Sequence, residues 1–397
     1  MLKIIIFIVS ALFAFHSALA QNNNGLEPFI NRSYINGDAQ LNEYLPLLQG
    51  KRVALIANQS SVFKNTHLAD TLLALGVKVK KVFSPEHGFR GKADAGEHVK
   101  NIKDFKTGLT IISLYGKNYK PKPADLKDVD VFIYDLQDVG ARFYTYISTL
   151  YYTLQSAAEL NKEYIILDRP NPNGFYVDGP VLEDSCKSYV GIIPIPIVHG
   201  CTVAELARMM IEEGWLKTLK RPDVKIISVK NYKHDDLIEL PVKPSPNLPN
   251  IESIVLYPSL CLFEGTDISV GRGTDTPFQI YGHPTFPKTE FSFIPVSTPG
   301  ASKNPPFQDQ KCNGYDVTTS VLDIYQNKKM KLSFIMNAYQ NFPNKSTFFN
   351  NYFKNLSGTK ELKQMIIDGK SESEIRYSWE SKLNEYKLKR QKYLLYP

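Results

Sequence analysis

The chain has 397 residues, of which 22% are charged, with a formal net charge of +7 at pH 7 and four cysteines. This length favours two domains, or one large domain with an appendage. The positive charge is diluted along the chain, with no basic tract interleaved with aromatic residues, which argues against nucleic-acid binding. The cysteines form no CxxC pair, which argues against a zinc ribbon.

The N-terminus has the pattern of a secretory signal peptide, which we predict to span residues 1–20. Lys3 precedes an apolar run, Ile4 to Phe15, and the small residues of Ala18-Leu19-Ala20 form a cleavage site. A membrane-spanning helix needs about 20 apolar residues, which this run lacks, and no later segment is apolar enough to span. We therefore expect a periplasmic or secreted protein, cut after Ala20, with no stable membrane insertion after cleavage.

Strand and helix patterns alternate from residue 26 to residue 240. Apolar, branched runs predict strands at 52–58, 77–83, 110–114, 129–135, 163–167, 192–198 and 224–229, and apolar spacing predicts helices at 67–75, 148–161 and 202–216. Mostly apolar strands alternating with helices imply a parallel sheet covered on both faces. The prediction is a Rossmann-like α/β domain. Such a fold binds ligands outside the carboxyl ends of its strands, so polar residues after each strand are the first site candidates.

A second, smaller α+β domain is predicted from residue 241 to residue 397. It begins with the proline-rich Pro241–Pro249, which cannot form regular structure. Turns and short strands follow to about Asp316, and the tail from about Thr318 has mostly helical spacing. We expect an active-site cleft between the two domains.

The loop after the first strand argues against a dinucleotide cofactor. It reads Ala57-Asn58-Gln59-Ser60-Ser61 and lacks the glycines of the GxGxxG turn that lets pyrophosphate approach the backbone. Gly271-Arg272-Gly273 has no third glycine and does not follow the first strand. The GKST phosphate loop is also absent, so no cofactor is predicted.

The second strand runs into Ser84-Pro85-Glu86-His87-Gly88-Phe89-Arg90-Gly91, which places a carboxylate, an imidazole and a guanidinium in one loop. Glycosidic cleavage needs a carboxylic acid that protonates the leaving oxygen, and usually a second group on the other face of the sugar. Glu86 is placed for the first role, and the adjoining His87 is a further catalytic candidate that would orient it or merely pack nearby. A solvated turn with a local Glu–Arg pair explains the same residues. Glu97-His98 adds ligands for a metal site, but HExxH spacing is missing and no metal is predicted.

Polar residues also follow the fourth strand. Asp135 is a further candidate for catalysis, and Asp138 for hydrogen bonding to sugar hydroxyls. Arg142 is suited to a two-pronged contact with a carboxylate, and Tyr144 and Tyr146 to stacking on a sugar. Helix capping by the aspartates and core packing by the tyrosines explain the same residues.

Two later segments complete the candidate set. The fifth strand ends in a loop stiffened by two prolines, which offers Asp168, Arg169 and Asn171 for substrate binding, although turn stabilisation explains the asparagine equally well. Glu264 is a candidate second carboxylate and Arg272 a second anion clamp, unless they belong only to two glycine-containing turns. They meet the first domain only if the chain folds back across the cleft.

The cysteines Cys186, Cys201, Cys261 and Cys312 are scattered through apolar or loop sequence. An oxidising compartment permits disulfides. Ordinary buried thiols fit the same positions, so their pairing is left open.

The strings SPEHGFRG, YDLQDVGARFYTY, DRPNPNG, VDGPVLE and FEGTDISVGRGTDTPF resemble the exo-β-N-acetylmuramidase family, and the likeness runs from about residue 50 to the C-terminus. The resemblance implies a Rossmann-like domain joined to a smaller one, with the site in the cleft between them. It also implies release of terminal N-acetylmuramic acid from the non-reducing ends of peptidoglycan fragments, in cell-wall turnover and recycling. The family's proposed catalytic glutamate lies in the SPEHG string, which here is Glu86.

N-acetylmuramic acid as the substrate would explain why arginines are among the candidate site residues. N-acetylmuramic acid carries a lactyl carboxylate that N-acetylglucosamine lacks, and a guanidinium fork would distinguish the two sugars. The candidates for this contact are Arg142, Arg169 and Arg272, with Arg90 behind them.

Two other functions stay open on sequence alone. The first is a non-catalytic exported sugar-binding protein, which hydrolysis of a chromogenic N-acetylmuramide would exclude. The second is a metal-dependent hydrolase of cell-wall glycan, or a deacetylase, that uses Glu86, His87 and His98. Loss of activity with a chelator would favour it.

Overall fold

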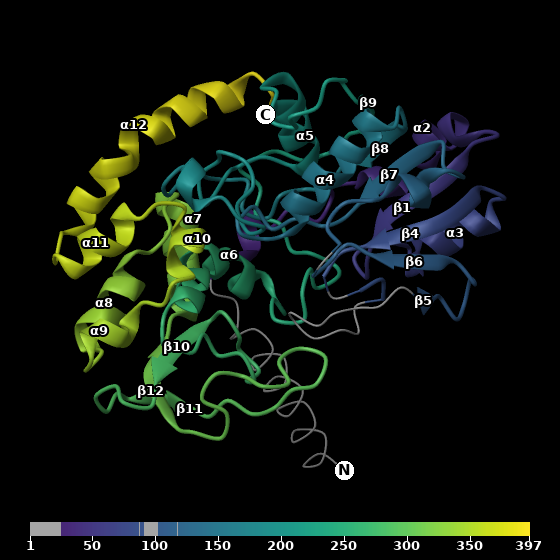
Figure 1. Cartoon of the computed structure of the whole chain (residues 1–397). Coiled ribbons are helices and arrows are strands. Elements are labelled where there is room, and N and C mark those ends of the chain that lie inside the picture. Colours follow the sequence, from purple (N-terminus) through teal and green to yellow (C-terminus); the bar gives the residue numbers. More distant parts are fainter. Residues whose placement is uncertain (1–24, 87, 91–101, 117) are drawn as a thin grey trace, which may run out of the picture.

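A computed structural model of the chain describes residues 25–86, 88–90, 102–116 and 118–397 (Figure 1). The predicted signal peptide, His87 and Glu97-His98 lie outside the described residues. Within the described residues, no helix is both long and apolar enough to cross a membrane.

A seven-stranded sheet forms the centre of the first half, in the order β5-β6-β4-β1-β7-β8-β9. The parallel strands are β1 (Arg52–Ala57), β4 (Lys78–Ser84), β6 (Thr110–Ser113), β7 (Val131–Asp135), β8 (Glu163–Leu167) and β9 (Asp223–Ile227). The edge strand β5 (Ile102–Lys103) is antiparallel, and β2 (Val62–Phe63) and β3 (Thr66–His67) form a separate hairpin. The predicted Rossmann-like, mostly parallel sheet is confirmed.

Helices cover both faces of this sheet because successive side chains of a strand point to opposite sides. Val53, Leu55 and Ala57 of β1 pack in one core cluster with α2 (Leu41–Tyr44) and α3 (Leu68–Ala74). Ala54 and Ile56 belong to the other cluster, with α4 (Tyr146–Glu159) and α5 (Val203–Glu212). The central strands β1, β7 and β8 are therefore buried on both faces, as their apolar sequences require, whereas the edge strand β9 is partly exposed.

The segment at 192–198 was predicted as a strand, and this prediction is wrong. Only Val198 forms isolated bridges, with Ala141 and Asp178. Pro194 and Pro196 lack the backbone N–H groups that a ladder needs. The segment is buried as irregular chain instead.

Helix α5 is shorter than its predicted range of 202–216. Thr202 and Glu205 cap its start reciprocally, but the helix ends at Glu212. Gly214 and Lys217 then adopt left-handed backbone, with φ of 65° and 52°. The chain turns away from α5 here, and Lys217 is exposed at the surface.

The second half is smaller and mixed. After the irregular proline-rich segment come α6 (Ile251–Leu260) and an antiparallel sheet in the order β10-β12-β11. These strands are β10 (Ile280–His283), β11 (Phe291–Phe293) and β12 (Cys312–Asp316), and the helices that follow are α7 (Val321–Asn327), α8 (Ser333–Asn341), α9 (Lys345–Phe348), α10 (Phe353–Ser357), α11 (Glu361–Ile367) and α12 (Glu372–Gln391). Short 3₁₀ turns are η1 (Glu27–Phe29), η2 (Gly37–Ala39), η3 (Leu45–Leu48), η4 (Pro123–Leu126), η5 (Asp184–Cys186), η6 (Cys261–Gly265) and η7 (Thr318–Ser320). The predicted smaller α+β part is confirmed.

The C-terminal helix joins the two halves. In Figure 1, α12 runs from α11 back toward α5, where the chain ends. Arg376 pairs with Asp178 at 2.8 Å, and the Tyr386 hydroxyl donates to the His199 carbonyl at 2.8 Å. One apolar core contains residues of both halves, so they pack as a continuous body. All four cysteines are buried, free thiols.

Candidate active site

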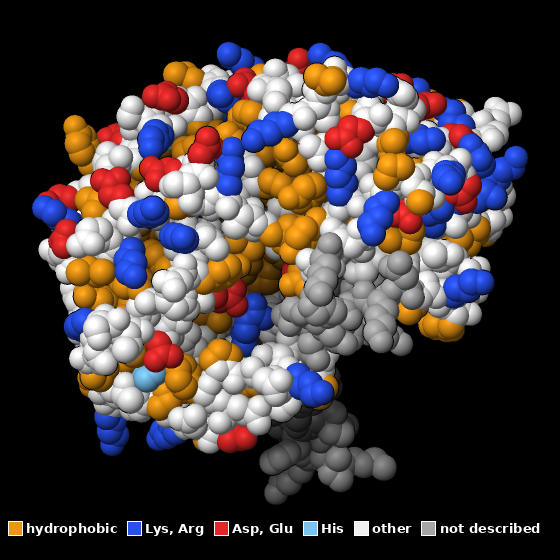
Figure 2. All heavy atoms as spheres, in the orientation of Figure 1, with side chains coloured by type: hydrophobic (Ala, Val, Ile, Leu, Met, Phe, Trp, Pro, Cys, Tyr) orange, Lys and Arg blue, Asp and Glu red, His pale blue; other side chains and the backbone are white. Residues whose placement is uncertain are grey.

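A cavity of about 350 Å³ lies between the two halves of the chain. The first half contributes Glu86, Tyr115, Phe143, Tyr144, Thr145, Tyr146, Ser188, Tyr189 and Val190, and the second contributes Ser245, Leu248, Tyr257, Glu264, Arg272, Phe278 and Tyr352. On the face drawn in Figure 2, the surface is hollowed between the halves and hydrophobic side chains border the hollow. The predicted cleft is therefore present, and the chain does fold back across it.

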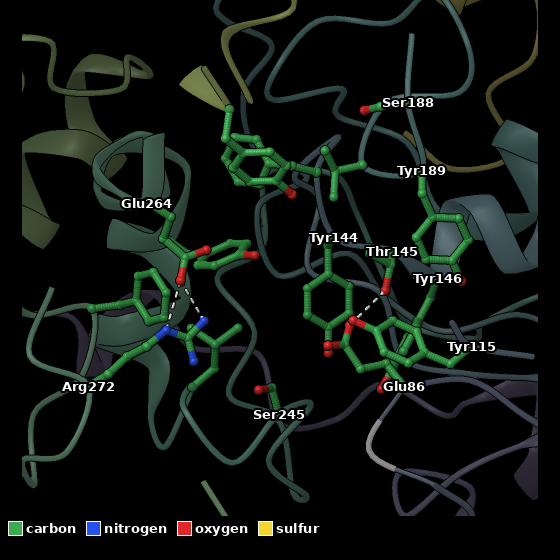
Figure 3. A pocket seen from close by; sticks show the side chains of 16 residues that line it. Glu86, Tyr115, Tyr144, Thr145, Tyr146, Ser188, Tyr189, Ser245, Glu264 and Arg272 are labelled. Carbon is green, nitrogen blue, oxygen red and sulfur yellow. Dashed lines mark hydrogen bonds and ion pairs between the residues drawn. The ribbon is translucent and has the colours of Figure 1, made fainter. Parts of the chain in front are cut away.

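Glu86 lies in the turn that follows β4, held by groups from neighbouring strand ends. The Gly88 N–H donates to the Pro85 carbonyl at 3.2 Å, and Gly88 has a φ of 73°, which glycine adopts without strain. The Thr145 hydroxyl donates to Glu86 Oε2 at 3.4 Å (Figure 3). The Tyr115 hydroxyl also forms a hydrogen bond with Glu86. Glu86 thus meets residues from the loops after β6 and β7 at the carboxyl edge of the sheet.

Tyrosine hydroxyls surround this carboxylate. Burial, and then the charge of Glu86, raise the pKa of Tyr115 above its ordinary range. Burial is also the main cause of the raised pKa values of Tyr146 and Tyr189, with Glu86 adding to both. Asn58, from the loop after β1, donates to the Tyr146 hydroxyl at 2.7 Å and fixes its position. These phenols therefore stay protonated, and Tyr115 uses its hydroxyl on Glu86.

The opposite wall carries an ion pair. Arg272 Nε and Nη2 both lie 2.7 Å from Glu264 Oε1, and the guanidinium lies over the Phe278 ring at 5.0 Å (Figure 3). Burial opposes the charge of Arg272, but Glu264 outweighs it, so the pKa of Arg272 is raised. No hydrogen bond from Nη1 to any of the described residues is present. The guanidinium is thus charged and held, with one edge unused by these residues.

Asp135 and Arg169 are not in the cavity lining. Arg169 Nε lies 2.6 Å from Asp135 Oδ1, and its Nη2 lies 2.8 Å from Asp38 Oδ2, with all three side chains at most 4% exposed. The predictions of catalysis by Asp135 and of substrate binding by Arg169 are corrected here. Both side chains already use their charge on each other beneath the N-terminal segment.

Arg142 is also buried away from the cavity. Its guanidinium donates to the carbonyls of Pro180, Ile195 and Leu356, at 2.8 to 3.0 Å. Burial lowers its pKa to about 9. Leu356 lies in α10, so Arg142 links the two halves rather than binding substrate, which corrects that prediction.

Asp138, Asp168 and Asn171 stabilise loops outside the cavity, so their predicted substrate contacts are corrected as well. Asp138 Oδ2 accepts from the Gly140 N–H at 2.7 Å and lies 3.3 Å from His199 Nε2. Asp168 accepts from the Tyr396 hydroxyl at 2.5 Å and from the Ala204 N–H at 3.1 Å. Asn171 Nδ2 donates to the Cys201 carbonyl at 2.9 Å.

Arg90, the reserve candidate for a carboxylate clamp, anchors the loop that carries Glu86. Its Nε and Nη2 donate to the two carboxylate oxygens of Asp104, each at 2.8 Å. This contact holds the pKa of Asp104 well below its usual range. Arg90 therefore fixes the geometry of the loop that carries Glu86.

Among the predicted site residues, Glu86, Tyr144, Tyr146, Glu264 and Arg272 line the cavity, whereas His87 lies outside the described residues. The sequence analysis missed Tyr115, Tyr189, Ser245, Tyr257 and Tyr352. Tyr115 follows β6, so the strand-end rule that found Glu86 could have found it. The other four have no local pattern, because distant segments bring them together.

The metal alternative depends on residues that are not described. Among the described residues, no three His, Cys, Asp or Glu side chains are grouped as metal ligands. His87 and Glu97-His98, on which this alternative rests, lie outside that part of the chain.

Comparisons with known proteins cover nearly the whole chain. Residues 53–252 match the family described as "Exo-beta-N-acetylmuramidase NamZ, N-terminal", and residues 255–396 match its C-terminal counterpart. The peptidoglycan beta-N-acetylmuramidase NamZ of Bacillus subtilis (strain 168) is 38% identical over 379 residues, which is 90% of each chain. Two crystal structures of DUF1343 family proteins from Bacteroides fragilis are also similar. One has a TM-score of 0.85 and 44% identity over 92% of this chain and 99% of its own, and the other has a TM-score of 0.75 and 27% identity over 92% and 100%.

Proposed function

This chain belongs to the exo-β-N-acetylmuramidase family, and we propose that it releases terminal N-acetylmuramic acid from the non-reducing ends of peptidoglycan fragments. It is a cell-wall glycoside hydrolase. The observation that carries the substrate assignment is the placement of Glu86 and Arg272 on opposite walls of one cavity. One group suits proton donation and the other suits recognition of a carboxylate.

The size of the cavity supports exo action. Ligand pockets range over about 300–1,000 Å³, and this cavity, at about 350 Å³, is near the lower limit. Such a space suits one terminal sugar rather than a length of glycan. The terminal sugar then occupies the cavity, and the rest of the fragment leaves it near Glu86.

Glu86 acts as the general acid in this proposal. Cleavage requires a proton on the leaving glycosidic oxygen as the bond to the anomeric carbon breaks. Tyr115 and Thr145 orient the Glu86 carboxyl by hydrogen bonds from neutral hydroxyls, which leave it able to exchange a proton.

Arg272 recognises the lactyl carboxylate. Glu264 fixes one edge of the guanidinium, and the Nη1 edge is available for a charge-assisted contact. N-acetylglucosamine has no carboxylate to place there, so it would leave the Nη1 edge of the guanidinium without this contact. Glu264 therefore positions Arg272 instead of serving as the second catalytic carboxylate.

The proposal includes export, supported by the N-terminal sequence pattern. Residues 1–20 would be removed, and the protein would act in the periplasm or outside the cell on peptidoglycan-derived muramyl saccharides. N-terminal sequencing of the active protein from its host should give Gln21 as the first residue. An intact Met1 on active protein would contradict this.

Activity is tested with matched chromogenic glycosides and natural fragments. We expect hydrolysis of an N-acetylmuramide, little hydrolysis of the matching N-acetylglucosaminide, and free N-acetylmuramic acid with a one-sugar-shorter fragment by mass spectrometry. Tight binding without turnover would instead show a sugar-binding protein. Loss of turnover on adding a chelator would indicate the metal-dependent alternative.

A further inference from the structure

A second groove, of about 600 Å³, adjoins the cavity between the two halves. Ser188 and Tyr189 line both spaces. The remaining wall of the groove comes from the segment after β6, from α4, from the turn after α5, and from Lys187 and the irregular chain at 192–194. The two spaces therefore meet at one short segment of the chain.

Aromatic rings form the part of the groove next to this junction. The Tyr119 ring stacks on Tyr189, with centroids 4.2 Å apart, and its other neighbour is Tyr152 at 6.1 Å. Tyr119 and Tyr152 are partly exposed, so ring surface is accessible to a ligand. Tyrosine presents an apolar body with a polar tip, which matches the apolar face and the hydroxyls of a sugar.

The far end of the groove carries positive charge. Gln155 lies one turn after Tyr152 on α4, and its Nε2 donates to the Leu216 carbonyl at 3.0 Å, so the groove extends to the turn with Trp215 and Lys217. Lys217 is exposed and has no ion-pair partner among the described residues. Lys187, also in the groove, is paired with Asp184 at 2.7 Å.

The position of Glu86 indicates which part of the substrate lies in the second groove. A general acid must lie beside the oxygen that joins the terminal sugar to the next one. Glu86 lies close enough to Tyr189 for its charge to influence that phenol, and Tyr189 is where the second groove begins. The saccharide on the leaving side of the scissile bond therefore starts at the groove.

We propose that the second groove binds the leaving part of the glycan, with N-acetylglucosamine against Tyr119 and the carboxylate of the following muramic acid at Lys217. This inference rests on the proposed function, and peptidoglycan strands alternate these two sugars. The groove would thus make a longer fragment a better substrate than a single glycoside, although the cleaved sugar is always the terminal one.

Three substrates distinguish the proposed contacts at Tyr119 and Lys217. They are a chromogenic N-acetylmuramide, the disaccharide with N-acetylglucosamine on the leaving side, and the trisaccharide that ends in a second muramic acid. Tyr119→Ala should lower kcat/KM for the disaccharide and the trisaccharide by about tenfold, which corresponds to 1.4 kcal/mol. It should leave the chromogenic glycoside unchanged, and Tyr119→Phe should keep normal activity on all three. Lys217→Glu should lower kcat/KM only for the trisaccharide, and added salt should reduce that difference.

Matched controls are Tyr377→Ala, an exposed tyrosine on α12, and Lys220→Glu, an exposed lysine outside the groove. Both should behave as wild type. If wild-type protein does not cleave the chromogenic glycoside, the proposed function fails. If it does, and neither Tyr119→Ala nor Lys217→Glu distinguishes the substrates, the groove proposal is overturned. Lys217→Glu keeps the test decisive if Tyr119→Ala does not fold.

Discussion

Charged side chains follow the parallel strands at two places on the same sheet edge, and their surroundings differ. Beyond β4, Glu86 bonds neutral hydroxyls and lines the cavity. Asp135, the last residue of β7, and Arg169, which follows β8, are buried and paired with each other. Glu86 is thus open to the ligand, whereas Asp135 is compensated by a cation and is closed off from the cavity.

The difference arises from what covers each strand end. The Gly37 N–H donates to the Asp168 carbonyl at 2.9 Å, and this N-terminal segment brings Asp38 to Arg169. The C-terminal tail adds Tyr396 on Asp168. The β4 end instead opens toward the second half of the chain, where the cavity forms.

The largest expected effect is on turnover, at Glu86. Glu86→Gln keeps the size and hydrogen-bonding shape but removes the acidic proton, so turnover of an N-acetylmuramide should fall by about 10²–10⁴-fold. The melting temperature and substrate binding should be unchanged. Glu385→Gln, at an exposed position on α12, is the matched control and should be silent. A folded Glu86→Gln protein with near-normal turnover would remove Glu86 from catalysis.

Asp135→Asn should lower the stability of the protein and leave its turnover almost unchanged, the reverse of the effect expected for Glu86→Gln. It takes one of two carboxylates from the buried Arg169 and leaves that charge undercompensated, which costs about 3–5 kcal/mol of unfolding free energy. Urea unfolding measures this loss, and the kcat of the folded fraction should stay close to wild type. A stable but inactive Asp135→Asn protein would show that the comparison drawn above is wrong.

The next largest effect on activity is expected at Arg272, which lines the cavity, whereas Arg169 does not. Arg272→Ala should lower kcat/KM for an N-acetylmuramide by roughly tenfold to a hundredfold, the loss of about 1.5–3 kcal/mol from a charge-assisted contact. Activity on the N-acetylglucosaminide should change little. Arg272→Lys should be intermediate, since it keeps the charge but loses the fork.

A double variant controls for the carboxylate that Arg272→Ala releases. Glu264→Gln with Arg272→Ala removes any repulsion between a freed Glu264 and the substrate. If the double variant recovers wild-type selectivity, repulsion explains the loss and Arg272 does not bind the lactyl group. Equal losses in the single and double variants support the clamp.

Local patterns in the sequence were sufficient for the sheet and for part of the site. Apolar, branched runs located the parallel strands because the central strands β1, β7 and β8 are buried on both faces. The rule that ligands lie beyond strand ends found Glu86, but it selected Asp135, Asp168 and Arg169 equally. Which strand ends are covered depends on Asp38 and Tyr396, which are distant in sequence from these strands and carry no local signal of that contact.

The failed strand at 192–198 and the role of Arg142 have a related cause. Alternating isoleucines suggested a strand, yet Pro194 and Pro196 prevent the ladder that would use it. Arg142 had the chemistry of a carboxylate clamp, but three carbonyls take up its donors. Residue type predicted what these groups can bind, and only the packing of distant segments decided what they do bind.

The smallest expected effect concerns pH and the buried strand-end residue Asp168. Burial raises its pKa from 3.8 to about 7, against the lowering effect of the Tyr396 hydrogen bond. Between about pH 4 and pH 7 the folded protein therefore holds a proton that the unfolded chain has released. Its contribution to stability is full below pH 4, falls as pH rises through this window, and levels off above pH 7.

Tyr396→Phe tests this titration. A hydrogen bond to an ionised carboxylate is worth about 1.5–3 kcal/mol and one to a neutral acid about 1 kcal/mol, so the variant should cost about 1 kcal/mol more at pH 8 than at pH 5. The Val229 N–H also loses its bond to Tyr396, but that cost is the same at both pH values. Tyr393→Phe is the matched control, because Lys389 and Tyr393 lower the pKa of Glu213 and keep that carboxylate ionised throughout. Urea unfolding of both variants at the two pH values gives the comparison. An equal cost for Tyr396→Phe at pH 5 and pH 8 would show that Asp168 does not change its charge in this range.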